Sequence, residues 1–197
     1  MDVVEPWSGK KSVLEKDGTI HSAGDTVLGA DDISGILEIL YGVQLVLDSG
    51  KSHKKIEILF TIGEELYVKG SDVFDYSKVT AKQAYVLDLS EETTFNIGTI
   101  QGGTATNIVP DCCVLTAYET TLESKSVTDF QKACEILGFS GGLTGTFGGS
   151  DNNSFAKNGI EGLVLSNGMY NAHSTREYTT VDDLYKGAEL IGQLILL

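Results

Sequence analysis

The chain has 197 residues, of which 41% are hydrophobic and 21% charged, so it is long enough for one globular domain with a packed core. Its 14 basic and 28 acidic residues give a formal net charge of -14, which argues against nucleic acid or an anionic membrane as a partner. No apolar run reaches the roughly 20 residues that span a bilayer, no signal peptide is visible, and the three cysteines without CxxC spacing favour a reducing compartment, so we expect a cytoplasmic protein.

The first half of the chain predicts a helix flanked by short strands. Asp17-Gly18 is typical of a hairpin turn. Apolar residues recur at steps of three and four over residues 31–47, which predicts a helix. The apolar runs at 55–62 and 84–89 predict two buried strands, because both are short and the first is rich in isoleucine.

The second half continues this alternation of strands and helices. The predicted elements are paired strands at 95–100 and 112–118, a helix at 126–137 with Ser126 as N-cap, a strand at 162–166, and a last helix that begins at Thr180 with Asp183 completing a capping box. Such alternation indicates an α/β protein in which helices cover a sheet.

Polar residues follow the predicted strands at their carboxyl ends, where ligands bind in open α/β sheets. They are Glu64 and Glu65 after 55–62, Asp88 in 84–89, Asp31 and Asp32 at the start of the first long helix, and Asn171 and His173 after 162–166. Carboxylates packed together repel unless a cation lies between them, and an imidazole among them favours zinc, cobalt or manganese. Taken singly, each residue is more often a helix cap, a turn or a solvated loop residue, so the pattern leaves both explanations open.

Seven segments form an ordered set that is spread over residues 1–178 of the chain. They are MDVVEP (1–6), DGTIHSAGDTVLGADD (17–32), ILFTIGEE (58–65), AYVLD (84–88), IGTIQGGTATNIVPD (97–111), FGGSDNN (147–153) and GMYNAHSTREY (168–178). Three motifs within these segments are jointly specific for one protein family: LGADD in 17–32, GEE after the predicted strand in 58–65, and NAHSTRE in 168–178. The set resembles the M20 family of metallopeptidases and, within it, the tripeptidase (peptidase T) branch.

The resemblance implies a role for each residue of a two-metal site. Asp31 would bridge two zinc ions, Glu65 and His173 would complete one of them, and Asp88 would serve the other. Glu64 would be the general base that acts on the bridging water, and Asp2 would orient a metal-bound histidine. The substrate-binding residues would be Asn107, Gly149, Ser150 and Asp151.

The resemblance also implies a fold, a reaction and partners. The fold would be a three-layer α/β/α sandwich with a mixed, mostly parallel sheet, formed by residues 1–90 and 125–197, with 91–124 as a remnant of the family's lid domain. The reaction would be metal-dependent hydrolysis of short peptides, as in a tripeptide aminopeptidase, with Zn2+, Co2+ or Mn2+. The expected partner is a short peptide substrate, with neither nucleic acid nor membrane.

Two departures from the family pattern leave alternatives open. The first metal motif of the family is histidine, any residue, aspartate; Asp2 matches the aspartate, and the histidine would lie before residue 1. After Asp88 the chain resembles only the middle hairpin of the lid. The alternatives are an active compact peptidase, an inactive remnant that keeps the fold and at most one metal site, and an M20-type amidohydrolase of N-acyl compounds. A binding module with phosphate-holding glycine loops is disfavoured, because no loop has P-loop spacing. The strands that precede the first metal motif in the family have no counterpart in this sequence. Their absence would leave a sheet edge unpaired, so we expect a homodimer or a poorly behaved monomer.

Overall fold

The computed structural model of this chain describes residues 3–66, 68–89, 101–102, 113–114, 122–143 and 150–197. In chain order the elements are β1 (Ser12–Leu14), β2 (Thr19–Ser22), α1 (Ala30–Ser49), α2 (Lys69–Asp72), the 3-10 helix η1 (Tyr76–Lys78), β3 (Gln83–Leu89), β4 (Gln101–Gly102), β5 (Cys113–Val114), α3 (Lys125–Leu137), α4 (Asn152–Lys157), β6 (Glu161–Ser166), β7 (Tyr178–Thr180) and α5 (Val181–Leu196). The predicted α/β class is therefore confirmed.

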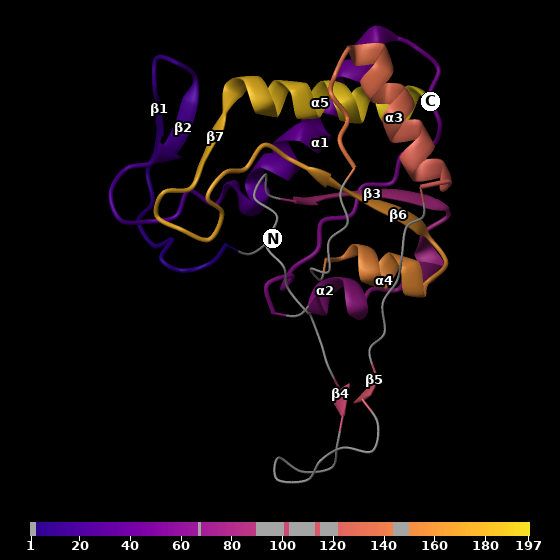
Figure 1. Ribbon diagram of the computed structural model, residues 1–197, viewed down its shortest axis with the longest axis horizontal. Helices are drawn as coiled ribbons and strands as arrows, with labels where there is room; N and C mark the ends of the chain where they lie inside the picture. Colours follow the sequence, from indigo (N-terminus) through magenta and orange to yellow (C-terminus); the bar gives the residue numbers. More distant parts are fainter. Residues whose placement is uncertain (1–2, 67, 90–100, 103–112, 115–121, 144–149) are drawn as a thin grey trace.

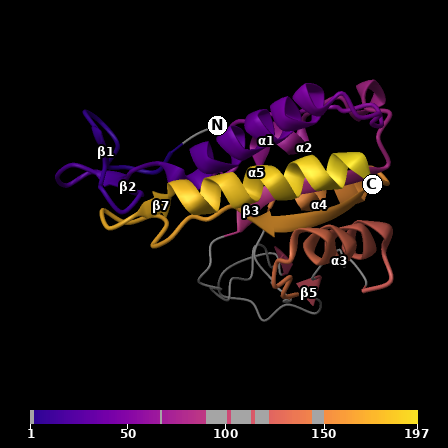
Figure 2. The ribbon, with the colours of Figure 1, turned by 90° about the horizontal axis from the view of Figure 1, so that it is seen from above.

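Two parallel strands, β3 and β6, lie between helices in the main body of the molecule (Figure 1). Their register runs from Gln83 opposite Glu161 to Leu87 opposite Leu165. Helices α1, α3 and α5 lie on one side of these strands and α2 and α4 on the other, and α1 and α5 pack side by side, as the view from above also shows (Figure 2). Because the two strands are parallel, their carboxyl ends, at Leu89 and Ser166, lie at the same edge of the sheet.

The remaining described strands form two small antiparallel pairings. β1, β2 and β7 make a sheet in that order, and β4 pairs with β5. The turn predicted at Asp17-Gly18 joins β1 to β2, where Asp17 Oδ1 accepts a hydrogen bond from the Thr19 amide at 3.0 Å. The predicted strand at 95–100 lies outside the described residues, and β5 is the described part of 112–118. The larger mixed sheet and the division at 91–124 stay predictions.

The hydrophobic core lies between β3, β6, α3 and α5. Its buried residues are Leu87, Ala133, Leu165, Ile191 and Leu194. Two of them, Ile191 and Leu194, come from α5, and Leu184 near the start of the same helix is only partly buried. None of the described helices is both long enough and apolar enough to cross a membrane.

Local sequence signals account for the starts of α3 and α5. Thr180 is the N-cap of α5, as predicted, and its Oγ1 accepts a hydrogen bond from the Asp183 amide at 3.1 Å. The predicted N-cap of α3 was wrong: Ser124, not Ser126, caps the helix by accepting from the Val127 amide. Both serines suit the position chemically, so residue type alone does not decide between them.

The buried face of helix α1 includes polar residues as well as apolar ones. Residues at steps of four along it, Ser34, Glu38, Gly42 and Val46, are buried. Gly42 permits a close approach to α5, because a Cβ there would lie 2.7 Å from the backbone oxygen of Ala188. Several of the apolar side chains that predicted the helix, Ile33, Leu37, Leu40 and Leu47, are exposed instead.

The predicted buried strand at 55–62 was wrong. None of these residues lies in a strand, and Ile58 and Phe60 are each 43% exposed. The segment forms one wall of a cavity of about 550 Å3, and the strand residues Tyr85 and Leu87 of β3 line it too. Within the described residues β3 pairs with β6 alone. An apolar run indicates burial against something, but it does not reveal whether a neighbouring strand is present to complete the ladder.

Candidate metal centre

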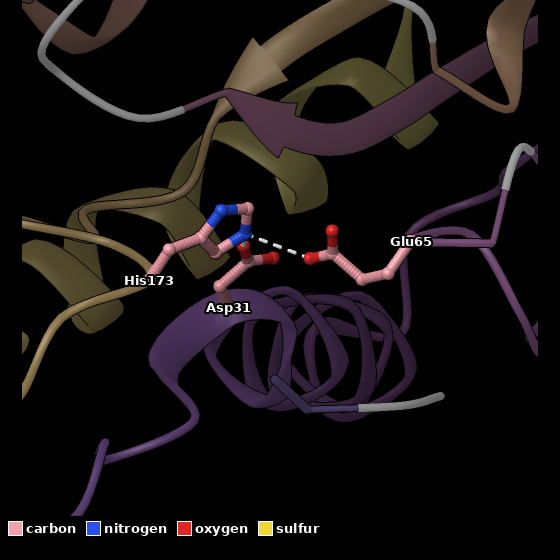
Figure 3. Close-up of side chains that lie close together, drawn as sticks. All are labelled: Asp31, Glu65 and His173. Carbon is pink, nitrogen blue, oxygen red and sulfur yellow. Dashed lines mark ion pairs between the residues drawn. The ribbon is translucent and has the colours of Figure 1, made fainter. Parts of the chain in front are cut away.

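Three side chains from distant parts of the chain meet beside the carboxyl ends of β3 and β6. Figure 3 shows Asp31 from the start of α1, Glu65 from the segment before α2, and His173 from the loop between β6 and β7, pointing toward one another. His173 Nε2 lies 2.6 Å from Asp31 Oδ2 and 2.7 Å from Glu65 Oε1. One ligand atom from each residue lies within 4.8 Å of the others, so the three could hold one metal ion.

Irregular backbone turns each of these side chains toward the others. Asp31 has non-helical dihedral angles although it lies within α1, and the peptide bond between Asp31 and Asp32 is cis. Glu65 follows Gly63, whose φ of 70° makes a tight turn. His173 itself has a φ of 62°, a conformation uncommon for a residue with a side chain. A positive φ in a residue with a side chain, as in His173, is frequent at ligand sites, where the surrounding structure holds it in place.

The electrostatics of this cluster favour a positive charge at its centre. Hydrogen bonding to Asp31 and then to Glu65 raises the pKa of His173 to about 10. In the metal-free protein a proton on the imidazole thus balances the two carboxylates. A divalent cation would do the same with greater charge, and carboxylate oxygens with an imidazole nitrogen are ligands that zinc accepts. The His173 side chain is 51% exposed, so an ion can reach the centre from solvent.

Further carboxylates lie behind this cluster, in the wall of the 550 Å3 cavity. Burial, reinforced by the charge of Asp31, raises the pKa of Asp32 to about 8. Burial, reinforced by Glu64 and Asp31, raises the pKa of Asp88 to about 9. Deeper in the α1–α5 contact, burial raises the pKa of Glu38 to about 9. Burial thus favours the neutral forms of these carboxyl groups in the metal-free protein, and a bound cation beside Asp32 and Asp88 would favour their charged forms.

These raised pKa values predict how the stability of the metal-free protein depends on pH. A carboxyl group whose pKa is higher in the folded state binds more protons when folded, so the free energy of unfolding falls as pH rises from about 5 to 8. A loss equivalent to a single pKa unit is about 1.4 kcal/mol. Even this loss, smaller than the shifts given above, should lower Tm by about 3 °C. Thermal unfolding in chelator across this range tests it. Asp88→Asn should flatten the slope and Asp25→Asn, at an exposed position, should not; a Tm that rises with pH contradicts the prediction.

The structure places the other predicted site residues in three groups. Glu64 and Asp88 line the cavity with Asp31 and Glu65, but neither belongs to the three-residue cluster. Asp151 lines it as well and accepts a hydrogen bond from Thr61 Oγ1. Ser150 is buried and does not line the cavity. The remaining predicted residues, Asp2, Asn107 and Gly149, lie outside the described residues.

Two buried polar residues near the cluster were not predicted from the sequence. Asn167 donates from Nδ2 to Asp32 Oδ1 at 2.5 Å and to Ser34 Oγ at 3.1 Å. Glu177 accepts hydrogen bonds from the amides of Gly29 and Asp31. The position of Asn167 directly after β6 was a usable signal, because polar residues there face the ligand edge. The Glu177 contacts span more than 140 residues of sequence, so no local pattern reveals them.

Comparison with known proteins identifies a family and relatives of this chain. A family model described as Peptidase family M20/M25/M40 matches residues 1–197. An uncharacterized Bacillus subtilis protein, YqjE, is 24% identical over 99% of this chain and 78% of its own length. Peptidase T of Clostridium botulinum is 44% identical over 106 residues, which cover 44% of this chain and 26% of that enzyme. Peptidase T of Vibrio cholerae is 31% identical over 60% of this chain and 28% of that enzyme.

Two solved structures have a similar fold. The crystal structure of aminopeptidase PepT from Bacillus cereus has a TM-score of 0.83 and 24% identity, and the match covers 99% of this chain and 78% of that one. The crystal structure of a tripeptidase from Staphylococcus aureus has a TM-score of 0.82 and 21% identity over the same shares. The path of this chain thus follows that of solved proteins that are longer than it is.

Proposed function

Because the chain belongs to peptidase family M20/M25/M40, we propose that it is a metal-dependent exopeptidase that hydrolyses short peptides in the manner of a tripeptide aminopeptidase. The observation that carries the proposal is the meeting of Asp31, Glu65 and His173, from segments up to 142 residues apart in the sequence, with ligand atoms within 4.8 Å of one another. Two carboxylates and an imidazole at the edge of an α/β sheet form a donor set for zinc, cobalt or manganese.

The described residues suggest which side chains would hold each of two metal ions. Asp31, Glu65 and His173 would hold one ion, and Asp31 together with Asp88 would contribute to a second, because both belong to the same acidic cavity. When bound, such ions polarise a carbonyl group and lower the pKa of water. The donor atoms fit this chemistry, since the carboxylates that face the cavity lie close together and need a compensating charge.

The reaction assigns a proton-transfer role to Glu64. Its carboxylate lines the cavity beside Asp31 and Asp88 and acts on both Asp32 and Asp88 through its charge. Glu64 would take a proton from the attacking water and deliver it to the amine that leaves the peptide. Asp151, which also lines the cavity, would lie close enough to contact the substrate, and Ser150 would support it from behind.

The proposal includes several broader features of the protein. We propose a three-layer α/β/α arrangement with a lid remnant at 91–124, a cytoplasmic location and a homodimer. The support for the last is the edge of β3, which within the described residues has no partner on the side away from β6. Unpaired strand edges favour association between chains.

Metal dependence is the measurement that tests the proposed function. Zinc or cobalt should activate hydrolysis of tripeptides, a chelator should abolish it, and mass spectrometry should show release of the N-terminal residue. At 100 times its dissociation constant, the metal should stabilise the fold by about 2.7 kcal/mol, which raises Tm by about 5–10 °C.

Other outcomes of the same assay favour the alternatives. A Tm that responds to zinc without any hydrolysis indicates a remnant that keeps one metal site. Hydrolysis of N-acyl amino acids in place of tripeptides indicates an amidohydrolase of the same family. Indifference of both Tm and hydrolysis to metal and chelator contradicts the proposal.

A further inference from the structure

A buried carboxylate lies directly behind the candidate metal centre. Glu177 is 2% exposed, and each of its oxygens accepts a hydrogen bond from a backbone amide at the start of α1. Oε2 lies 2.6 Å from the Gly29 nitrogen and Oε1 lies 3.0 Å from the Asp31 nitrogen. A buried carboxylate is costly unless it is well hydrogen-bonded, and bonds of amides to a charged acceptor are strong ones.

These two hydrogen bonds complete the start of α1. The helix has no side-chain cap of its own, because its N-cap residue is Gly29. The first backbone amides of a helix lack partners within the helix, and the positive end of the helix dipole attracts a carboxylate. Glu177 therefore supplies from a distant loop what a neighbouring serine or aspartate usually supplies.

The same residue belongs to the loop that carries His173. That loop is closed by the bridge between Tyr170 and Tyr178, whose rings stack with centroids 4.7 Å apart. Inside it, Ser174 Oγ donates to the Asn171 oxygen at 2.7 Å, and the Glu177 amide donates to the Ser174 oxygen at 3.1 Å. His173 thus sits in a small hydrogen-bonded unit, and the side chain of Glu177 ties this unit to the backbone of Asp31.

We propose that Glu177 is a positioning residue that fixes the separation between the Asp31 carboxylate and the His173 imidazole. The inference rests on the proposed function, because that separation matters only if the two side chains share an ion. Glu177 touches neither the ion nor the substrate. It acts by holding the backbone of one ligand, Asp31, against the loop that carries the other.

Glu161 offers a matched control, because it makes the same kind of bond elsewhere. Its Oε1 accepts from the Ser126 amide at 2.6 Å, near the start of α3. A purely structural role predicts that Glu177→Gln and Glu161→Gln lower Tm and leave zinc affinity alone. A positioning role predicts that Glu177→Gln alone weakens zinc binding, since its amide NH2 group cannot accept from a backbone amide.

The experiment measures zinc affinity by calorimetry at a temperature where every variant is folded. Glu177→Gln should weaken zinc binding by at least about tenfold, as loss of a group that orients a ligand does, and Glu161→Gln should change it less than twofold. If Glu177→Gln does not fold, Glu177→Asp, which keeps the charge, replaces it in the zinc-affinity measurement. Equal zinc affinity in the wild type and the Glu177 variants overturns the proposal while leaving the proposed function intact.

A second readout does not need the metal. In the metal-free protein at fixed pH, the ring chemical shifts of His173 report its contact with Asp31 and Glu65. Glu177→Gln should move them and Glu161→Gln should not. If the wild type binds no zinc, the proposed function fails, but this spectrum still tests the role of Glu177. His173 ring shifts that are the same in the wild type and in Glu177→Gln overturn the positioning role.

Discussion

Glu64→Gln is expected to lower kcat/KM for tripeptide hydrolysis by about 10³-fold while zinc stays bound. The size follows from the 10²–10⁴-fold contribution of a well-placed general base. Glutamine keeps the shape of the side chain, but its amide cannot take a proton from water. Glu64 lines the acidic cavity and does not belong to the three-residue ligand cluster, so the metal should remain.

The measurement pairs steady-state kinetics with zinc titration of the same sample. Glu135→Gln is the matched control, because Glu135 is exposed on α3, and it should leave both quantities unchanged. A variant that keeps full activity would remove Glu64 from the mechanism. A variant that loses zinc as well would show that Glu64 is a ligand and not the base.

His173→Ala should abolish the response of the protein to metal. His173 supplies the nitrogen ligand of the cluster and lies within 2.7 Å of both carboxylates. Without it, Asp31 and Glu65 alone would hold the ion. Losing a group that merely orients a ligand costs 10–100-fold in metal affinity, so losing the ligand should cost at least about 100-fold.

Zinc titration and the zinc-induced rise in Tm test this prediction. His53→Ala is the control, since the exposed His53 ring bonds to the neighbouring Lys54 oxygen at 2.8 Å, outside the cluster. Unchanged zinc affinity in His173→Ala would place the metal elsewhere or exclude it. Hydrolysis that survives without zinc binding would contradict the metal-dependent mechanism as a whole.

Short apolar runs and helix caps made the elements around the core predictable. The strands β3 and β6 begin within one residue of their predicted starts, and α5 begins directly after the predicted cap Thr180. These elements bury apolar side chains against one another, so their pattern in the sequence directly reflects their environment.

Prediction failed where the buried residues are not the apolar ones that the sequence pattern identifies. Glu38 and Gly42 occupy the buried face of α1 while Leu40 is exposed, and no periodicity identifies an acidic residue as the buried one. The run 55–62, predicted as a strand from its composition, forms no strand. Pairing depends on a neighbour that the run itself does not specify.

The candidate site was predicted in part for a different reason. Strand-end positions pointed to Glu65 and His173, but the assignment of ligands came from the family resemblance. The supporting residues escaped notice, because the bonds of Asn167 to Asp32 and of Glu177 to Asp31 depend on how distant segments fold together.

In the part of the chain that the structure describes, β3 pairs with β6 alone, and this has a practical consequence for purification of the protein. β3 also lines the cavity, together with the largely apolar residues 56–60. An unpaired strand edge favours association between chains. Association between chains, which increases with protein concentration, should therefore limit storage more than heat does. At low ionic strength the net charge of -14 keeps molecules apart, so dilute, cold, low-salt buffers should preserve the protein longest.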